Sequence, residues 1–168
     1  MIEGLVMNSI ANGDRFRQIM GRFATGVAVV TAKDSNKNYG MTVNSLTSVS
    51  LDPALLLVCL AHGKSTLRAI LESKRFAVHL LGSQQEALCK RFVKHERDKF
   101  DGLELVHHNT GLPILKDCLA YVVCDVDSVH AAGDHDIVVG RARDYDHSDS
   151  EPLLYLRGQF GRFAALCM

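Results

Sequence analysis

Seven apolar, β-branched segments, each ended by Gly, Pro or a polar turn, limit the fold of this chain more than any other feature. They span 27–32, 39–50, 54–60, 75–81, 119–129, 136–145 and 152–156. Runs of this length and composition are typical of strands. Three other stretches, 15–23, 65–73 and 83–94, favour helices. Because strands and helices do not alternate regularly, we expect a mainly β fold, a Greek-key antiparallel β-barrel with peripheral helices.

Length and charge are those of one ordinary domain. The chain has 168 residues, with 19 basic and 19 acidic side chains and no net charge. Without a basic excess, a general nucleic-acid partner is not expected. No apolar run approaches the ~20 residues of a membrane-spanning helix, so no membrane partner is expected either. We divide the chain into an N-terminal extension at 1–12 and a single domain at 13–168.

The cysteines indicate a reducing compartment. Five cysteines are an odd number in a chain long enough to form its own core, which favours free thiols. The first sixteen residues include Glu3 and lack a basic start, unlike a secretory signal. We therefore expect a cytoplasmic protein. Cys118 and Cys124 would lie about 20 Å apart along a strand, too far for one zinc ion, so no metal site is expected.

The segment Gly63-Lys64-Ser65-Thr66 resembles the end of a phosphate-binding P-loop. The complete motif needs Gly five residues before Gly63, where this chain has Val58. A nucleotide triphosphatase is therefore excluded. Two alternatives remain: a weaker anion site at the start of a helix, or an ordinary helix start with a solvated lysine. No G-x-G-x-x-G occurs, so a Rossmann dinucleotide site is not expected.

Two further segments allow both a functional and a purely structural interpretation. Residues 42–50 carry six hydroxyl or amide side chains that do not alternate cleanly with apolar ones. Such a segment can contact a planar polar ligand, or it can be a polar sheet edge or bulge. Gly133-Asp134-His135 lies between two long strands. It predicts a hairpin turn whose imidazole is either simply exposed or lies beside a ligand.

Taken together, these segments resemble the flavin reductase family with the FMN-binding split-barrel fold, the small reductase components of two-component flavin-dependent monooxygenases. The resemblance covers residues 16–160. Its matching stretches are MGRFATGV at 20–27, GMTVNSLTSVSLDP at 40–53, FAVHLL at 76–81, GLP at 111–113, AGDH at 132–135 and PLLY at 152–155. The order and spacing of these stretches are specific, although no single one is decisive. His79 departs from the pattern, since Asn is expected there.

The resemblance implies roles for particular residues. Flavin contact is implied along one strand and its continuation, at Thr42, Val43, Asn44, Ser45, Leu46, Ser48 and Val49. Contact with the ribityl chain and phosphate is implied at Cys59, Leu60, Ala61, Lys64, Ser65 and Thr66. Arg91 and Phe92 would border the flavin. Nicotinamide contact is implied at Gly133, Asp134, His135, Pro152, Leu153, Leu154 and Tyr155, with His135 as the catalytic residue.

The activity implied is that of an NAD(P)H:flavin oxidoreductase. It would transfer hydride from NADH or NADPH to FMN or FAD and supply reduced flavin to a partner oxygenase. The family is usually homodimeric, so a homodimer is implied. The alternative is a flavin-binding protein, or an oxidase of the pyridoxamine-phosphate type, without nicotinamide-dependent activity. The lack of an Arg/Lys-rich phosphate cluster beyond Lys64 and its neighbours argues against the oxidase.

Overall fold

A computed structural model describes residues 13–35, 37–94 and 98–165. Its main element is a seven-stranded sheet with the strand order β3-β2-β6-β9-β10-β5-β4, in which every neighbouring pair is antiparallel. The strands are β2 (Ala28–Lys33), β3 (Asn38–Val43), β4 (Thr47–Leu51), β5 (Ala54–Ala61), β6 (Arg75–Leu80), β9 (Ala120–Ala132) and β10 (His135–His147). The predicted mainly β, antiparallel fold is confirmed.

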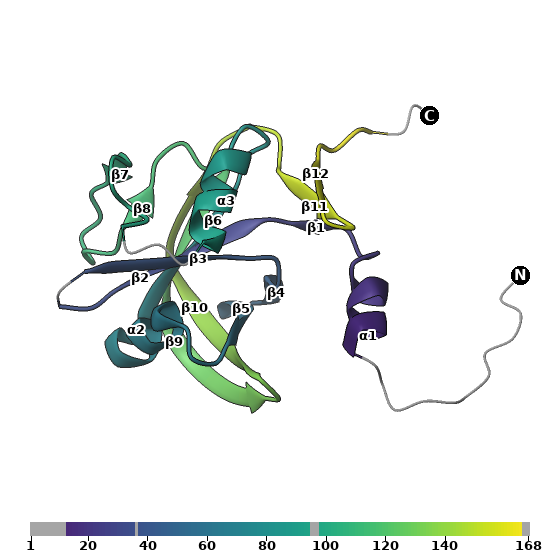
Figure 1. Ribbon diagram of the computed structural model, residues 1–168. Coiled ribbons are helices and arrows are strands. Elements are labelled where there is room, and N and C mark those ends of the chain that lie inside the picture. The colour runs from purple at the N-terminus through teal and green to yellow at the C-terminus, as the bar shows by residue number, and fades with distance from the viewer. Residues whose placement is uncertain (1–12, 36, 95–97, 166–168) are drawn as a thin grey trace, which may run out of the picture.

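Three helices and two small sheets surround this sheet (Figure 1). The helices are α1 (Gly13–Met20), α2 (Ser65–Ser73) and α3 (Glu86–Val93). One small sheet contains β1 (Thr25–Gly26), β11 (Leu154–Leu156) and β12 (Gln159–Gly161), and the other pairs β7 (Leu105–Val106) with β8 (Ile114–Leu115). Together with α1, the sheet of β1, β11 and β12 stands to one side of the seven strands (Figure 1). Among the described residues, no helix is long and apolar enough to cross a membrane.

Strand β2 is covered on both faces, which explains its continuous apolar sequence. Val30 and Ala28 face one core, which β2, β5 and β6 share with α2. Val27 and Val29 face a second core that includes Cys89 of α3. In Figure 1, α2 and α3 lie on opposite sides of the β2–β3 pair. A strand that is buried on both faces lacks the alternation of polar and apolar residues that a half-exposed strand has. The same packing holds α3 above β3, and a mostly apolar cavity lies between these two elements.

The structure differs from the sequence prediction mainly at the ends of elements. The predicted strand at 39–50 is two strands, β3 and β4, separated by Asn44, Ser45 and Leu46. The hydroxyl of Ser45 bonds to the backbone of β5 in this break, so the chain turns there instead of continuing straight. The first helix ends at Met20, three residues before the predicted end, and the short strands β1, β7, β8 and β12 were not predicted. The predicted extension at 1–12 lies outside the described residues.

Candidate functional site

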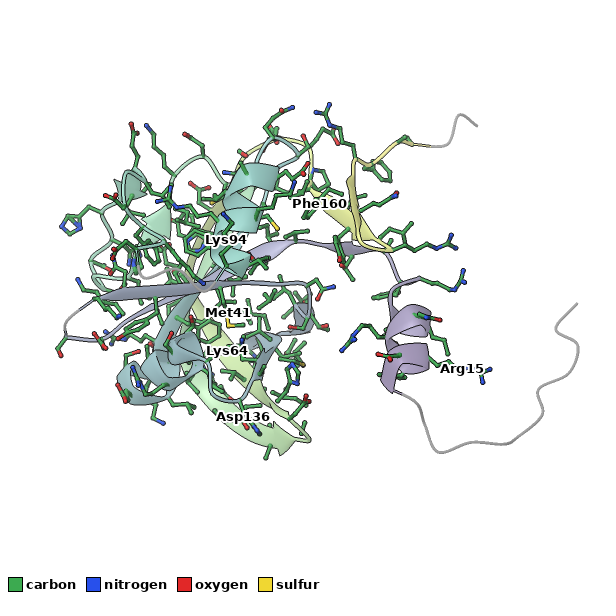
Figure 2. All side chains as sticks on the ribbon, in the orientation of Figure 1. Arg15, Met41, Lys64, Lys94, Asp136 and Phe160 are labelled. Atoms are coloured by element: carbon green, nitrogen blue, oxygen red, sulfur yellow. The ribbon has the colours of Figure 1, made fainter. Side chains whose placement is uncertain are left out.

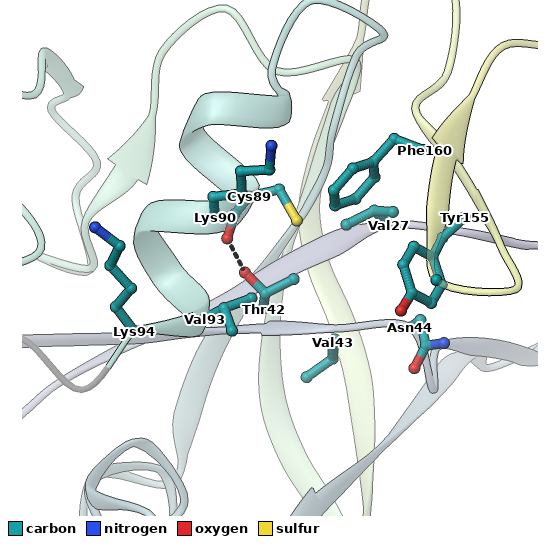
Figure 3. A pocket seen from close by; sticks show the side chains of 11 residues that line it. Val27, Thr42, Val43, Asn44, Cys89, Lys90, Val93, Lys94, Tyr155 and Phe160 are labelled. Atoms are coloured by element: carbon teal, nitrogen blue, oxygen red, sulfur yellow. Dashed lines mark hydrogen bonds between the residues drawn. The ribbon is translucent and has the colours of Figure 1, made fainter. Parts of the chain in front are cut away.

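A cavity of about 560 Å³ lies between α3, β3 and the β11–β12 hairpin (Figure 3). Its floor and walls are mostly apolar, with polar groups at the edges. Eleven residues line it: Val27, Thr42, Val43, Asn44, Cys89, Lys90, Val93, Lys94, Tyr155, Gly158 and Phe160. Sites of this size with a few placed polar groups are typical of small-molecule and cofactor binding.

The walls of this cavity are held by specific contacts. The Thr42 hydroxyl donates a 2.8 Å hydrogen bond to the Cys89 carbonyl, which ties β3 to α3. On the opposite wall, the rings of Tyr155 and Phe160 pack together with their centroids 5.5 Å apart. Burial raises the pKa of the Cys89 thiol, so the sulfur that faces the cavity is a neutral packing group (Figure 3). The cavity therefore has fixed walls before any ligand enters.

A second cavity, of about 610 Å³, adjoins the first and shares Asn44, Tyr155 and Gly158 with it. It lies between the end of α1 and the turn of the β11–β12 hairpin. Three arginines line it: Arg17, Arg22 and Arg157. Sequence reasoning missed these arginines, because they come from opposite ends of the chain and follow no local motif.

Ser45 joins the predicted flavin segment to β5. Its hydroxyl donates to the Cys59 carbonyl at 2.9 Å and accepts from the Cys59 amide at 3.1 Å. Next along the chain, Leu46 lines a smaller cavity of about 260 Å³. On β4, Ser48 and Val49 are exposed at the point where the β4–β5 register shifts. A bulge of this kind was one of the two alternatives for the segment, and it leaves these side chains available to a ligand.

A second group of predicted residues gathers where β5 ends and β10 begins. His135 pairs in register with Ala61, and Asp134 accepts a 3.0 Å hydrogen bond at its carbonyl from the amide of His62. The imidazole of His135 lies 2.7 Å from the Asp134 carboxylate, and this contact lowers the pKa of Asp134. His62, which sequence reasoning did not single out, contacts Asp136 at 3.0 Å. Gly133 has a φ of +66°, as the predicted hairpin turn requires.

The start of α2 follows this hairpin contact closely in the chain, since His62 is three residues before Ser65. Lys64 precedes the helix and provides no side-chain cap, and Ser65 is exposed in the first turn. The first amides of a helix have no partner within the helix, so they are free to receive an anion. Neither Lys64 nor His135 is among the residues that line the two larger cavities between α3 and α1. The predicted residues thus form two groups, with the Ser45–Cys59 link between them.

Several predicted contact residues have side chains that the chain itself covers. Leu60, Thr66, Phe92 and Leu153 are each no more than 3 % exposed. Phe92 packs edge-on against Phe100, with ring centroids 5.1 Å apart. The guanidinium of Arg91 donates to the carbonyl of Asp101 instead of facing the cavity. Pro152 forms an isolated bridge with Gly82, and Leu154 pairs with β1. Any ligand contact of the four buried residues would have to come from their backbone, and their roles stay predictions.

The profile of the family described as "Flavin reductase like domain" matches residues 20–164. The chain belongs to this family. An FMN reductase (NADH) of Agrobacterium fabrum is 42% identical over 153 residues, which cover 91% of this chain and 87% of the relative. The reductase subunit of a flavin-dependent monooxygenase from Rhodococcus jostii is 35% identical over 159 residues, covering 94% and 82%. The family assignment made from the sequence is confirmed.

Among solved structures, an NADH:FAD oxidoreductase of Streptomyces globisporus superposes with a TM-score of 0.88 and 32% sequence identity. The superposition covers 95% of this chain and 98% of that one. The split-barrel architecture is therefore confirmed. These relatives favour the flavin reductase interpretation over the oxidase of the pyridoxamine-phosphate type. They also support a flavin and a nicotinamide reductant as the cofactors of the family.

Proposed function

We propose that this chain is an NAD(P)H-dependent flavin reductase that supplies reduced FMN or FAD to a partner oxygenase. The observation that carries this proposal is the cavity formed by Thr42 and Val43 of β3 and by Asn44 directly after it, opposite Tyr155. An isoalloxazine is a flat, largely apolar ring with polar atoms along one edge. Its shape fits an apolar floor of Val27 and Val43 with amide and hydroxyl groups at the rim.

The residues at the other end of the proposed site fit the flavin phosphate. Lys64 supplies a cation and Ser65 a hydroxyl at the start of α2, where helix amides also favour anions. The Ser45–Cys59 link holds the segment between the two ends in place. When bound, the flavin supplies the hydride-accepting ring, and the protein supplies position and a fixed polar environment. His135, held by Asp134, would orient the nicotinamide.

Relatives described as reductase subunits of monooxygenases support an oxygenase partner. Transfer between two proteins requires that reduced flavin leave this one, so we expect modest flavin affinity and a purified protein that is only partly yellow. A homodimer is part of the proposal, because α1 has no buried residue and exposes Phe16, Ile19 and Met20. The four cysteines that the structure describes are free thiols, which supports a cytoplasmic location.

The test is steady-state oxidation of NADH and of NADPH with no flavin, with FMN, with FAD and with riboflavin. The proposal predicts oxidation that rises with added flavin and a clear preference for one nicotinamide. Flavin reduced without oxygen should then support turnover by a flavin-dependent monooxygenase on the other side of a dialysis membrane, where oxygen is supplied. A protein that binds flavin but oxidises neither nicotinamide would favour the flavin-binding alternative.

A further inference from the structure

The cavity at the end of α1 has an unusual charge for this chain. Arg17, Arg22 and Arg157 line it, and Lys90 and Lys94 line the adjoining cavity. Among the described residues, neither lining includes an Asp or a Glu, although the whole chain has as many acidic as basic residues. Clustered guanidinium groups without carboxylates favour phosphate, which they bind through paired, charge-assisted hydrogen bonds.

Two of these arginines have no competing partner in the described part of the chain. Arg17 lies 3.3 Å from Asp14, but both side chains are more than four-fifths exposed, so this contact is weak. Within residues 13–35, 37–94 and 98–165, no carboxylate pairs with Arg22 or Arg157. Their charges are therefore available to a ligand in the cavity.

The backbone of Arg157 provides a second, independent observation. Leu156 and Gln159 pair across the β11–β12 hairpin, so Arg157 and Gly158 form a two-residue turn with φ of 51° and 81°. Turns with two positive φ values favour Asn-Gly or Gly-Gly, and an arginine in the first position is strained. The amide of Arg157 donates a 2.9 Å hydrogen bond to the Gly21 carbonyl, which fixes the turn beside the end of α1. An arginine held in this conformation beside a cavity points to a functional role.

We propose that Arg22 and Arg157, assisted by Arg17, bind the pyrophosphate of a dinucleotide that enters through this cavity. The proposal rests on the proposed function and deepens it. The reducing nicotinamide dinucleotide is the source that the geometry favours, because the flavin phosphate is assigned to Lys64 and the start of α2. The cavities share Asn44 and Tyr155, so a ligand held by the arginines reaches the site proposed for the flavin ring.

The test compares Arg157→Asn and Arg22→Gln with Arg15→Gln. Asparagine tolerates positive φ, so the Arg157→Asn variant should keep or raise the melting temperature while losing the guanidinium. Arg15 lies on the same helix as Arg17 but points away from the sheet (Figure 2), so its variant is a matched control. The probe is ADP-ribose, which has the pyrophosphate but no nicotinamide, and its binding is measured by titration calorimetry.

We expect each of Arg22→Gln and Arg157→Asn to raise the Kd of ADP-ribose about tenfold, and Arg15→Gln to leave it unchanged. With FMN as the flavin, the KM for the nicotinamide should rise by a similar factor in the first two variants. If instead the affinity for FAD falls toward that for FMN while the nicotinamide KM stays constant, the pyrophosphate bound is that of FAD.

The proposal is overturned if both variants leave three quantities within about twofold of wild type: the ADP-ribose Kd, the nicotinamide KM and the ratio of FAD to FMN affinity. A failure of the proposed function has a different result, since wild-type protein would then oxidise neither nicotinamide. ADP-ribose binding would still report on the arginines in that case, because it needs no turnover.

Discussion

Ser45 and Cys59 exchange two hydrogen bonds through a single side-chain oxygen, at 2.9 Å to the carbonyl and 3.1 Å from the amide of Cys59. This contact replaces a ladder pair at the point where the chain leaves β3 and turns toward β4. It joins the two groups of residues that make up the candidate site. The orientation of Asn44 and Leu46 therefore depends on a side chain that need not itself touch a ligand.

Ser45→Ala should lower both stability and flavin affinity. The change leaves an amide and a carbonyl of β5 without their partner, which costs about 1–3 kcal/mol when such groups are partly buried. Chemical unfolding and flavin titration would measure the two effects. Ser48→Ala is the matched control, because Ser48 is exposed on β4. It should leave the free energy of unfolding unchanged, and any loss of flavin affinity in it reports direct contact. Equal stability of the two variants would contradict the positioning role of Ser45.

His135→Ala should raise the KM for the nicotinamide far more than it raises the Kd of the flavin. The imidazole is at the start of β10, 2.7 Å from the Asp134 carboxylate, and it is accessible to a second ligand. His130→Ala is the control, since His130 is an exposed histidine in the same hairpin. Steady-state kinetics and flavin fluorescence titration would separate the two constants. Equal weakening of both ligands would argue against the nicotinamide role.

The buried imidazole of His79 should make stability fall with acid. Desolvation lowers the pKa of His79 to about 4, although the carbonyl of Val29, 3.1 Å from Nδ1, opposes the shift. In the unfolded chain, His79 binds a proton near its ordinary pKa of about 6.5. In the folded chain, it binds the proton only near pH 4. The stabilisation is therefore complete above pH 6.5 and is lost progressively down to pH 4. The total effect is on the order of 3 kcal/mol.

Unfolding free energies measured across this pH range in wild type and in His79→Asn would test this prediction. Asn does not titrate, and it is also the residue that the family pattern leads us to expect at this position. The slope of stability against pH should be smaller in His79→Asn. An identical slope in the two proteins would assign the acid sensitivity to other groups. The absolute stability of His79→Asn at neutral pH does not test this prediction. The substitution also removes the Nε2 of His79, which is buried without a hydrogen-bond partner among the described residues.

The sequence predicts those elements whose determining residues lie close together in the chain. The boundaries of α2 follow from the sequence, since an apolar helical face at 65–73 lies between two strands. The β9–β10 hairpin follows from Gly133 and its two long flanking segments. The cavity near α1 cannot be predicted from the local sequence, because Arg22 and Arg157 are 135 positions apart in the chain. They come together through the hydrogen bond from the Arg157 amide to the Gly21 carbonyl. The burial of Phe92 was also missed, since Phe100 covers it from a loop without regular structure.

Gly140 should tolerate no side chain. A Cβ at this position would lie 2.4 Å from the Phe76 ring and 2.9 Å from the Cβ of Cys124, both fully buried. Gly140→Ala should therefore destabilise the protein by about 1–3 kcal/mol through overpacking. Gly161→Ala is the control, because no heavy atom lies within 4 Å of its Cβ position. Thermal unfolding would measure both variants, and equal melting temperatures would contradict the packing of Phe76 against β10.

Phe16→Glu should convert the proposed dimer to a monomer. Phe16, Ile19 and Met20 share one face of α1, and each is at least half exposed in the single chain. Covering such side chains contributes about 1.5–3 kcal/mol each, so a buried carboxylate in their place strongly opposes association. Tyr145→Glu is the control, because Tyr145 is a similarly exposed aromatic residue on β10. Light scattering after size-exclusion chromatography would give the molecular masses. A wild-type monomer, or a Phe16→Glu variant that stays dimeric, would show that α1 does not form the interface.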